Sequence, residues 1–309
     1  MPEGYTHVRT ARRAARETDM ERKIHPAAFC AGANGPDEFF CYQIWKSAPN
    51  RDVDLPALGR RMHHENTGRF LMSLVEHAET PVQQSYVLGF LSHYITDCIL
   101  HPYVNMISGE GQLYAGPGGH GYFEIALDSE LHARDYKSRA VSAAHSNPRM
   151  AGTPLIQVSQ LLQTCLKEVY GLEIGLEPIA DAFHHAHFLR SCFVSRLGVK
   201  KLICSWVEPL FGGKGFITGH VSPARFKNKL TLETLPARWK NPYTGQECEI
   251  SVEELLSEAV RKTVTAMFTC QSCWKGRTPK EELARMLGSR SYESGLEDAC
   301  SLGQEEYRE

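Results

Sequence analysis

The sequence lacks both the long hydrophobic run of a membrane-spanning protein and the basic excess of a nucleic-acid-binding protein. Its 309 residues include 34 Lys and Arg against 36 Asp and Glu, which gives a formal net charge of −2. No apolar stretch approaches the roughly 20 residues that a transmembrane helix needs. A nearly neutral chain also has no broad positive field that would attract nucleic acid. We therefore expect neither a transmembrane segment nor a nucleic-acid partner.

The features of a signal peptide are also missing. The segment 1–19 (MPEGYTHVRTARRAARETD) is polar, and it lacks the apolar core and the cleavage site of a secretory signal. The ten cysteines are accordingly expected to be reduced thiols in a cytoplasmic protein. Cys270 and Cys273 form a CxxC pair, but no second pair follows at a zinc-binding spacing, so we interpret them as packing residues.

Strand-like alternation, internal repeats and low-complexity tracts are absent, whereas helical patterns cover most of the chain. With 42% hydrophobic residues, the chain can bury a sizeable core. The fold class is predicted to be all-α, with one helical domain over residues 1–290 and a polar, disordered tail over residues 291–309. Pro102 is expected to bend or end its helix. Helices are predicted over residues 5–18, 24–33, 55–78, 81–105, 121–136, 155–170, 177–196, 251–268 and 280–287, and a loop over residues 212–246.

Candidate metal ligands are concentrated in the stretch 86–131. Residues four apart lie one above the other on one face of an α-helix. A lone pair of this kind is often an ordinary surface contact, but here the polar residues interrupt an apolar run, where unpaired polar groups are costly. Imidazole and carboxylate groups on facing helices predict a metal site, with zinc favoured over iron or manganese. The residues at this spacing are His93, Asp97 and His101, followed by His120, Glu124 and Asp128.

Several other polar residues are weaker candidates for metal ligands or are expected to support the ligands. His64 is adjacent to His63, and the residue pattern alone does not decide between them. The histidines of the segment 184–187 (HHAH) point to different faces of a helix and are interpreted as surface residues. Asp128 and His132 continue the face of Glu124, and we predict that they hold ligands in place by hydrogen bonds.

Taken in order, the motifs of this chain resemble the zinc-dependent phospholipase C family, an all-helical group related in fold to the S1/P1-type nucleases. Each motif alone is weak, but their combination is specific and extends from residue 6 to about residue 260. The matching pieces are Thr6-His7, Gly35-Pro36-Asp37, Met62-His63 with Thr67-Gly68, GFLSH at 89–93, Asp97, His101-Pro102-Tyr103, His120-x-x-x-Glu124 and Trp239-Lys240-Asn241-Pro242.

The resemblance implies a multi-helix bundle around a buried cluster of two or three zinc ions. By similarity, one ion would be surrounded by Asp37, His63, His93 and Asp97. A second would be held by His101, His120 and Glu124, and a third by His7 with Asp97 as the bridging carboxylate. Asp37 would also be the candidate general base. Secreted members complete the third site with a processed N-terminal tryptophan, whereas this chain begins Met1-Pro2-Glu3.

Phosphodiester hydrolysis gives a chemical reason for such a cluster. The reaction needs an activated water, neutralised phosphoryl oxygens and a stabilised leaving alkoxide, and closely spaced divalent ions supply all three. The sequence therefore predicts a zinc-dependent, phospholipase C-like phosphodiesterase in which Asp37 orients or deprotonates a zinc-activated water. Its substrate would be a small-molecule or lipid phosphodiester.

Three alternatives remain open at this point, and the sequence does not indicate an oligomeric state. One is a nuclease on the same scaffold, although the slightly acidic composition disfavours it. Another is a metal-dependent enzyme recruited to small-molecule chemistry, such as a biosynthetic hydrolase or lyase. The third is a protein in which zinc is purely structural. A closed four-ligand site would favour structure, and an open coordination position would favour catalysis.

Overall fold

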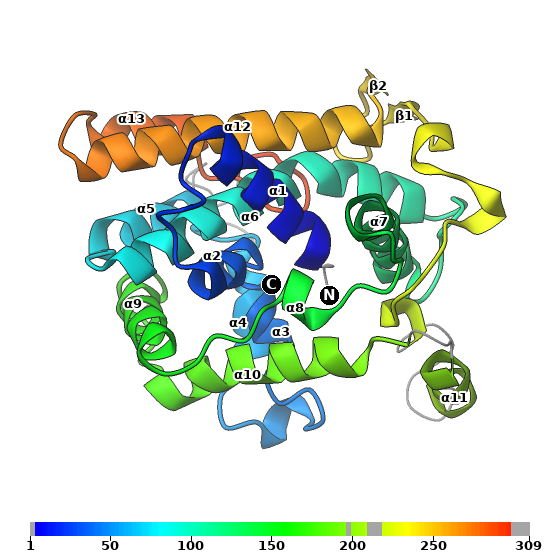
Figure 1. Cartoon of the computed structure of the whole chain (residues 1–309), viewed down its shortest axis with the longest axis horizontal. Helices are drawn as coiled ribbons and strands as arrows, with labels where there is room; N and C mark the ends of the chain where they lie inside the picture. The colour runs from blue at the N-terminus through cyan, green and yellow to red at the C-terminus, as the bar shows by residue number, and fades with distance from the viewer. Residues whose placement is uncertain (1–3, 196–198, 209–217, 298–309) are drawn as a thin grey trace, which may run out of the picture.

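The computed structural model describes residues 4–195, 199–208 and 218–297, and in it a ring of helices surrounds one long helix, α6 (Pro81–Ser108) (Figure 1). Thr80 caps the start of α6 by accepting from the backbone N–H of Gln83, whose side chain accepts from the N–H of Thr80 in return. A capping box followed by proline in the first turn is a strong helix start. Pro102 was expected to bend or end this helix, and it does not end it, since α6 continues to Ser108.

The N-terminal half supplies mostly short helices. They are α1 (Gly4–Glu17), α2 (Pro26–Ala33), α3 (Asp37–Phe40), the 3₁₀ turn η1 (Ala48–Asn50), α4 (Leu55–Met62) and α5 (Thr67–His77). Of these helices, α1, α2 and α5 pack against α6. The single helix predicted over 55–78 is therefore two helices. Asn66 adopts a left-handed conformation with φ of 54°, which breaks the chain direction between them and leaves His63 as the residue that caps the end of α4.

The rest of the described chain is also mainly helical, with one small hairpin. Its helices are α7 (Gly119–Tyr136), α8 (Ala143–Ser146), α9 (Thr153–Tyr170), α10 (Leu176–Cys192), α11 (Val199–Val207), α12 (Val252–Trp274) and α13 (Lys280–Leu287). Between α11 and α12 lie the turns η3 (Thr218–His220), η4 (Lys227–Lys229) and η5 (Leu232–Thr234), and the antiparallel strands β1 (Arg238–Lys240) and β2 (Glu247–Glu249). The all-α prediction is confirmed, although α11 and the hairpin were not predicted.

Two glycines let α2 cross α6 with the two backbones in contact. A Cβ atom added to Gly89 would lie 2.1 Å from the carbonyl oxygen of Phe29, and one added to Gly32 would lie 2.0 Å from that of Tyr86. No side chain fits at either position without moving a helix, so glycine is required at this crossing. The close approach places the turn after α2, which carries Asp37, directly above the middle of α6.

The apolar residues form two cores, and α6 passes from one into the other. Its residues from Tyr86 to Ile95 belong to a core shared with α2, α5, α9 and the C-terminal half of α12. Its residues from Leu100 to Ile107 belong to a second core shared with α7 and the start of α12. The polar residues His93, Asp97 and His101 therefore lie at the junction of the two cores.

The segment that follows α13 is part of the folded domain. Tyr292 is only 1% exposed, and its backbone N–H donates to the carbonyl oxygen of His63 at 2.9 Å. The prediction of a disordered tail from residue 291 is therefore wrong for residues 291–297, and the predicted domain boundary at 290 is too early. Residues 298–309 lie outside the described part of the chain.

The structure can be compared with two expectations from the sequence, one about transmembrane helices and one about the cysteines. Within the described ranges, no helix is both long enough and apolar enough to cross a bilayer. The cysteines of those ranges form no disulfide. Cys270 and Cys273 are buried in the first core, as packing residues would be.

Candidate metal centre

The side chains predicted to bind metal lie together in one continuous network, which we call the ligand cluster. They come from α1, the first turn of α3, the end of α4, the middle of α6 and the start of α7, and all are buried except His120, whose side chain is 41% exposed. Within the cluster, three groups have ligand atoms that all lie within 4.8 Å of one another. The cluster consists of His7, Asp37, His63, His93, Asp97, His101, His120 and Glu124.

The first group is built around the carboxylate of Asp37. Its Oδ1 lies 3.1 Å from Nε2 of His63, and its Oδ2 lies 3.7 Å from Nε2 of His93. The turn that carries Asp37 depends on Gly35, which has φ of +54° and packs so tightly that an added Cβ would lie 2.2 Å from the His93 ring. Glycine tolerates both the positive φ and the close approach.

The second group joins α1 to α6 through Asp97. One carboxylate oxygen of Asp97 is 3.2 Å from Nε2 of His7, and the other is 3.0 Å from Nε2 of His93. His7 is held in place by the start of α1. There the buried carboxylate of Asp128 accepts from the backbone N–H groups of Tyr5 at 2.9 Å and Thr6 at 2.7 Å.

The third group lies between α6 and α7. Oε1 of Glu124 is 3.4 Å from Nε2 of His101 and 3.2 Å from Nε2 of His120. The His120–Glu124 pair has the predicted one-turn spacing on α7. This group connects to the second one because Nδ1 of His101 is 3.6 Å from Asp97. Asp97 thus stands at the centre of the cluster, next to three imidazoles.

Backbone carbonyls fix the orientation of three of the imidazole rings. Nδ1 of His63 bonds the carbonyl of Gly59 at 2.6 Å, and Nδ1 of His93 bonds that of Ala33 at 3.2 Å. Nδ1 of His101 bonds the carbonyl of Tyr292 at 3.0 Å. A carbonyl only accepts, so Nδ1 must carry the proton, and a neutral ring then presents its Nε2 lone pair to the cluster. Metal-binding histidines are typically held in this way.

The residues of the cluster fit a bound cation. Two ligand atoms about 2.1 Å from a tetrahedral zinc ion are about 3.4 Å apart. The contacts between imidazole nitrogens and carboxylate oxygens in the groups range from 3.0 to 3.7 Å, and all ligand atoms of a group lie within 4.8 Å of one another. A buried polar atom left without a partner costs about 1–3 kcal/mol. A bound cation would satisfy the atoms of the cluster that lack one. The buried atoms without a hydrogen-bond partner include His7 Nδ1, Asp37 Oδ2, His93 Nε2, Asp97 Oδ2 and Glu124 Oε2.

Neighbouring groups of opposite charge stabilise the charged forms of Asp97 and His101, although both side chains are buried. Burial alone raises the pKa of Asp97, but the surrounding imidazoles, led by that of His101, hold it well below its usual range. Burial alone lowers the pKa of His101, but the carboxylates of Asp97 and Glu124 outweigh it and raise the pKa to about 10. Metal binding to these imidazoles would have to release the protons that the carboxylates stabilise on them.

Two residues that sequence reasoning did not single out lie against the cluster. The ring centroid of Tyr292 is 4.9 Å from that of His63 and 5.7 Å from that of His93. The ring of His220 packs against Gly121, where an added Cβ would lie 2.3 Å from it. Burial lowers the pKa of His220 to about 3, so its ring is neutral. Neither residue is close to a ligand in sequence, so no local spacing could have indicated it.

His63 and His64 have different surroundings in the structure. The His63 side chain faces Asp37, whereas the His64 side chain is 45% exposed and lies near Glu293. Of the HHAH histidines, His187 bonds the carbonyl of Asn147. Within the described residues, neither His64 nor any histidine of the HHAH segment belongs to a group that could hold a metal.

The predicted supporting residues of α7 have different roles. Asp128 supports His7 through the backbone of α1, as described above. His132 bonds His145 at 2.7 Å and the carbonyl of Ser138 at 2.5 Å, so both of its ring nitrogens are engaged away from the cluster.

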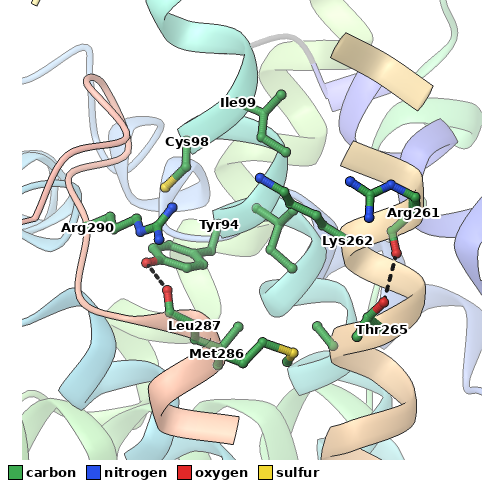
Figure 2. Close-up of a pocket in the computed structure, with 11 residues that line it drawn as sticks. Tyr94, Cys98, Ile99, Arg261, Lys262, Thr265, Met286, Leu287 and Arg290 are labelled. Carbon is green, nitrogen blue, oxygen red and sulfur yellow. Dashed lines mark hydrogen bonds between the residues drawn. The ribbon is translucent and has the colours of Figure 1, made fainter. Parts of the chain in front are cut away.

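In the described part of the chain, a small cavity next to α6 belongs to the cluster, and a larger one beside the same helix does not. A space of about 20 Å³ is lined by Thr6, His7, Asp97, His101 and Glu124 among others, which is enough for about one water-sized probe. A second cavity of about 260 Å³ lies between α6, α12 and α13 (Figure 2). Its lining includes Tyr94, Cys98 and Arg290 but no residue of the ligand cluster.

A family model described as zinc dependent phospholipase C matches residues 6–169, just over half of the chain. The matched range contains every residue of the ligand cluster, but it ends before Tyr292 and His220. No curated protein and no solved structure shows significant similarity to the chain.

Proposed function

Because the chain belongs to the zinc-dependent phospholipase C family, we propose that it hydrolyses a phosphodiester bond in a phospholipid-like substrate with two or three bound zinc ions. Family membership and the buried groups of histidines and carboxylates support a zinc hydrolase. The observation that carries the finer proposal is the set of buried ligand atoms that lie within 4.8 Å of one another, several of which have no hydrogen-bond partner.

Each group of the cluster would hold one ion. Asp37, His63 and His93 would hold the first, and His101, His120 and Glu124 the second. The third would lie between His7 and Asp97, with Asp97 as the bridging carboxylate. When bound, the ions would lower the pKa of a water molecule and neutralise phosphoryl oxygens.

Asp37 is the residue that we assign to proton transfer. Its Oδ1 faces His63 at 3.1 Å, while its Oδ2 has no hydrogen-bond partner and is buried. A carboxylate with one engaged and one available oxygen can orient an attacking water and accept its proton. Because Asp37 lies in the first turn of a short helix pinned by Gly35, its position is fixed without help from the substrate.

The exposure of His120 favours catalysis over a purely structural role. Its side chain is 41% exposed, whereas that of Glu124, its neighbour in the same group, is 9% exposed. A structural zinc site is closed by its protein ligands, while a catalytic site retains an accessible position. We place the entry of substrate at this end of the cluster, beside the start of α7.

The test compares the wild-type protein with Asp37→Asn on a chromogenic phosphodiester and on phospholipid micelles. Asp37→Asn should retain most of the bound zinc, because the amide oxygen can still coordinate, and lose turnover by about 10²–10⁴-fold. Asp181→Asn is the matched control, because its partly exposed carboxylate lies on α10 and outside the cluster. An Asp37→Asn variant that remains fully active on every phosphodiester tested would contradict the mechanism.

A further inference from the structure

Helix α11 exposes a continuous apolar face. Val199, Leu202, Ile203 and Trp206 are 57%, 60%, 59% and 79% exposed. They are spaced at i, i+3, i+4 and i+7, which places all of them on one side of a helix. Single exposed apolar residues are common on protein surfaces, but a stripe of them along one helix face marks an interaction surface.

The charges of α11 are all of one sign. Its sequence, VKKLICSWV, contains two lysines and no acidic residue, and Lys200 is exposed. The next residue, Glu208, is turned inward and is only 3% exposed. There it accepts hydrogen bonds from the backbone N–H and the hydroxyl of Thr218. The exposed side of the helix thus combines an apolar stripe with positive charge.

We propose that α11 is a docking helix for an anionic lipid surface. Helices that lie in the membrane interface combine basic residues with an apolar face that contains tryptophan and leucine, and tryptophan prefers the interface because its ring is amphipathic. Positive charge beside the stripe complements anionic lipids. A second copy of the chain fits less well, because pairing two such stripes would bring lysines of the same sign together.

The position of α11 gives the docking surface a connection to the ligand cluster. Glu208 ties the end of α11 to η3, and η3 ends at His220, whose ring packs against Gly121. Gly121 follows His120, the exposed member of the cluster. In Figure 1, α11 lies at the lower right, on the same side of the molecule as α7. The proposal rests on the exposure and charge of α11 and does not require the proposed hydrolysis.

The experiment measures how the 309-residue chain partitions onto vesicles of phosphatidylcholine that contain about 30% of the anionic lipid phosphatidylglycerol. Binding is measured by flotation, without a turnover assay. The wild-type protein should float with the vesicles, and Trp206→Lys should reduce partition at least tenfold. Trp206→Phe, which retains an apolar ring, should retain binding. Phe268→Lys is the matched control, since Phe268 is 52% exposed on α12, along the opposite edge of Figure 1.

Each outcome of this experiment either supports or overturns the proposal. Equal partition of wild-type protein and Trp206→Lys, or no binding by the wild-type protein, would overturn it. A fall in molecular mass from dimer to monomer in Trp206→Lys would show that the stripe covers a second copy, and would also overturn it. Circular dichroism checks that the variants fold, and activity on a soluble phosphodiester reports separately on the proposed function.

Discussion

The role of the segment after α13 is testable through Tyr292, which the structure buries against the ligand cluster. Its side chain is 1% exposed, and its ring contacts those of His63, His93 and Tyr94. Truncating a buried aromatic residue to alanine typically costs about 3–5 kcal/mol, because the lost transfer free energy adds to that of the cavity. We expect Tyr292→Ala to lower the free energy of unfolding by that amount.

The assay is urea denaturation followed by circular dichroism, at one fixed zinc concentration because bound metal stabilises the native state. Tyr243→Ala is the control. Tyr243 is 41% exposed, and its loss should cost about 1 kcal/mol or less. If Tyr292→Ala cost no more than the control, residues 288–297 would not pack over the cluster as described, and the tail expected from the sequence would be correct after all.

Two further predictions concern the cluster itself. Since its ligands come from α1, α3, α4, α6 and α7, exhaustive treatment with EDTA should lower the melting temperature of the whole domain, and an unchanged thermal melting curve would count against a buried metal cluster. His63→Ala should lose both zinc and activity, whereas His64→Ala should retain both, because only His63 faces Asp37. The reverse pattern would mean that the end of α4 is oriented differently.

The part of the site that lies on α6 and α7 could be predicted because its signal is local. His93, Asp97 and His101 repeat every four residues, and His120 and Glu124 do the same, so helix geometry alone aligns them. The apolar run around His93 and Asp97 indicated that these two side chains would be buried, and both are. The resemblance of the motifs then added His7, Asp37 and His63, which helix periodicity could not connect to α6.

The contribution of residues 218–297 to the site could not be predicted, because it depends on contacts distant in sequence. Tyr292 lies in a polar segment after the last helix, and polarity alone predicts disorder there. Its buried position follows from contacts with residues about 200 positions earlier, such as His93. His220 likewise meets Gly121 only through the folded arrangement of α7 and η3.

Errors in the predicted helix boundaries have similar causes. The break at Asn66 comes from a left-handed backbone conformation, and an isolated asparagine gives only a weak signal for one. The continuation of α6 beyond Pro102 reflects tertiary packing. Tyr103, Val104 and Ile107 are buried in the second core, and this packing holds the last turns of the helix even though proline removes one backbone hydrogen bond.

The central claim is that the ligand cluster binds zinc, and the most direct test is the metal content of freshly purified protein. Elemental analysis combined with native mass spectrometry gives both the identity of the metal and the number of ions per chain. The account predicts two or three zinc ions per chain, bound through the three groups, of which two share His93 and the third contains Glu124. Protein that is folded but carries no transition metal would contradict it.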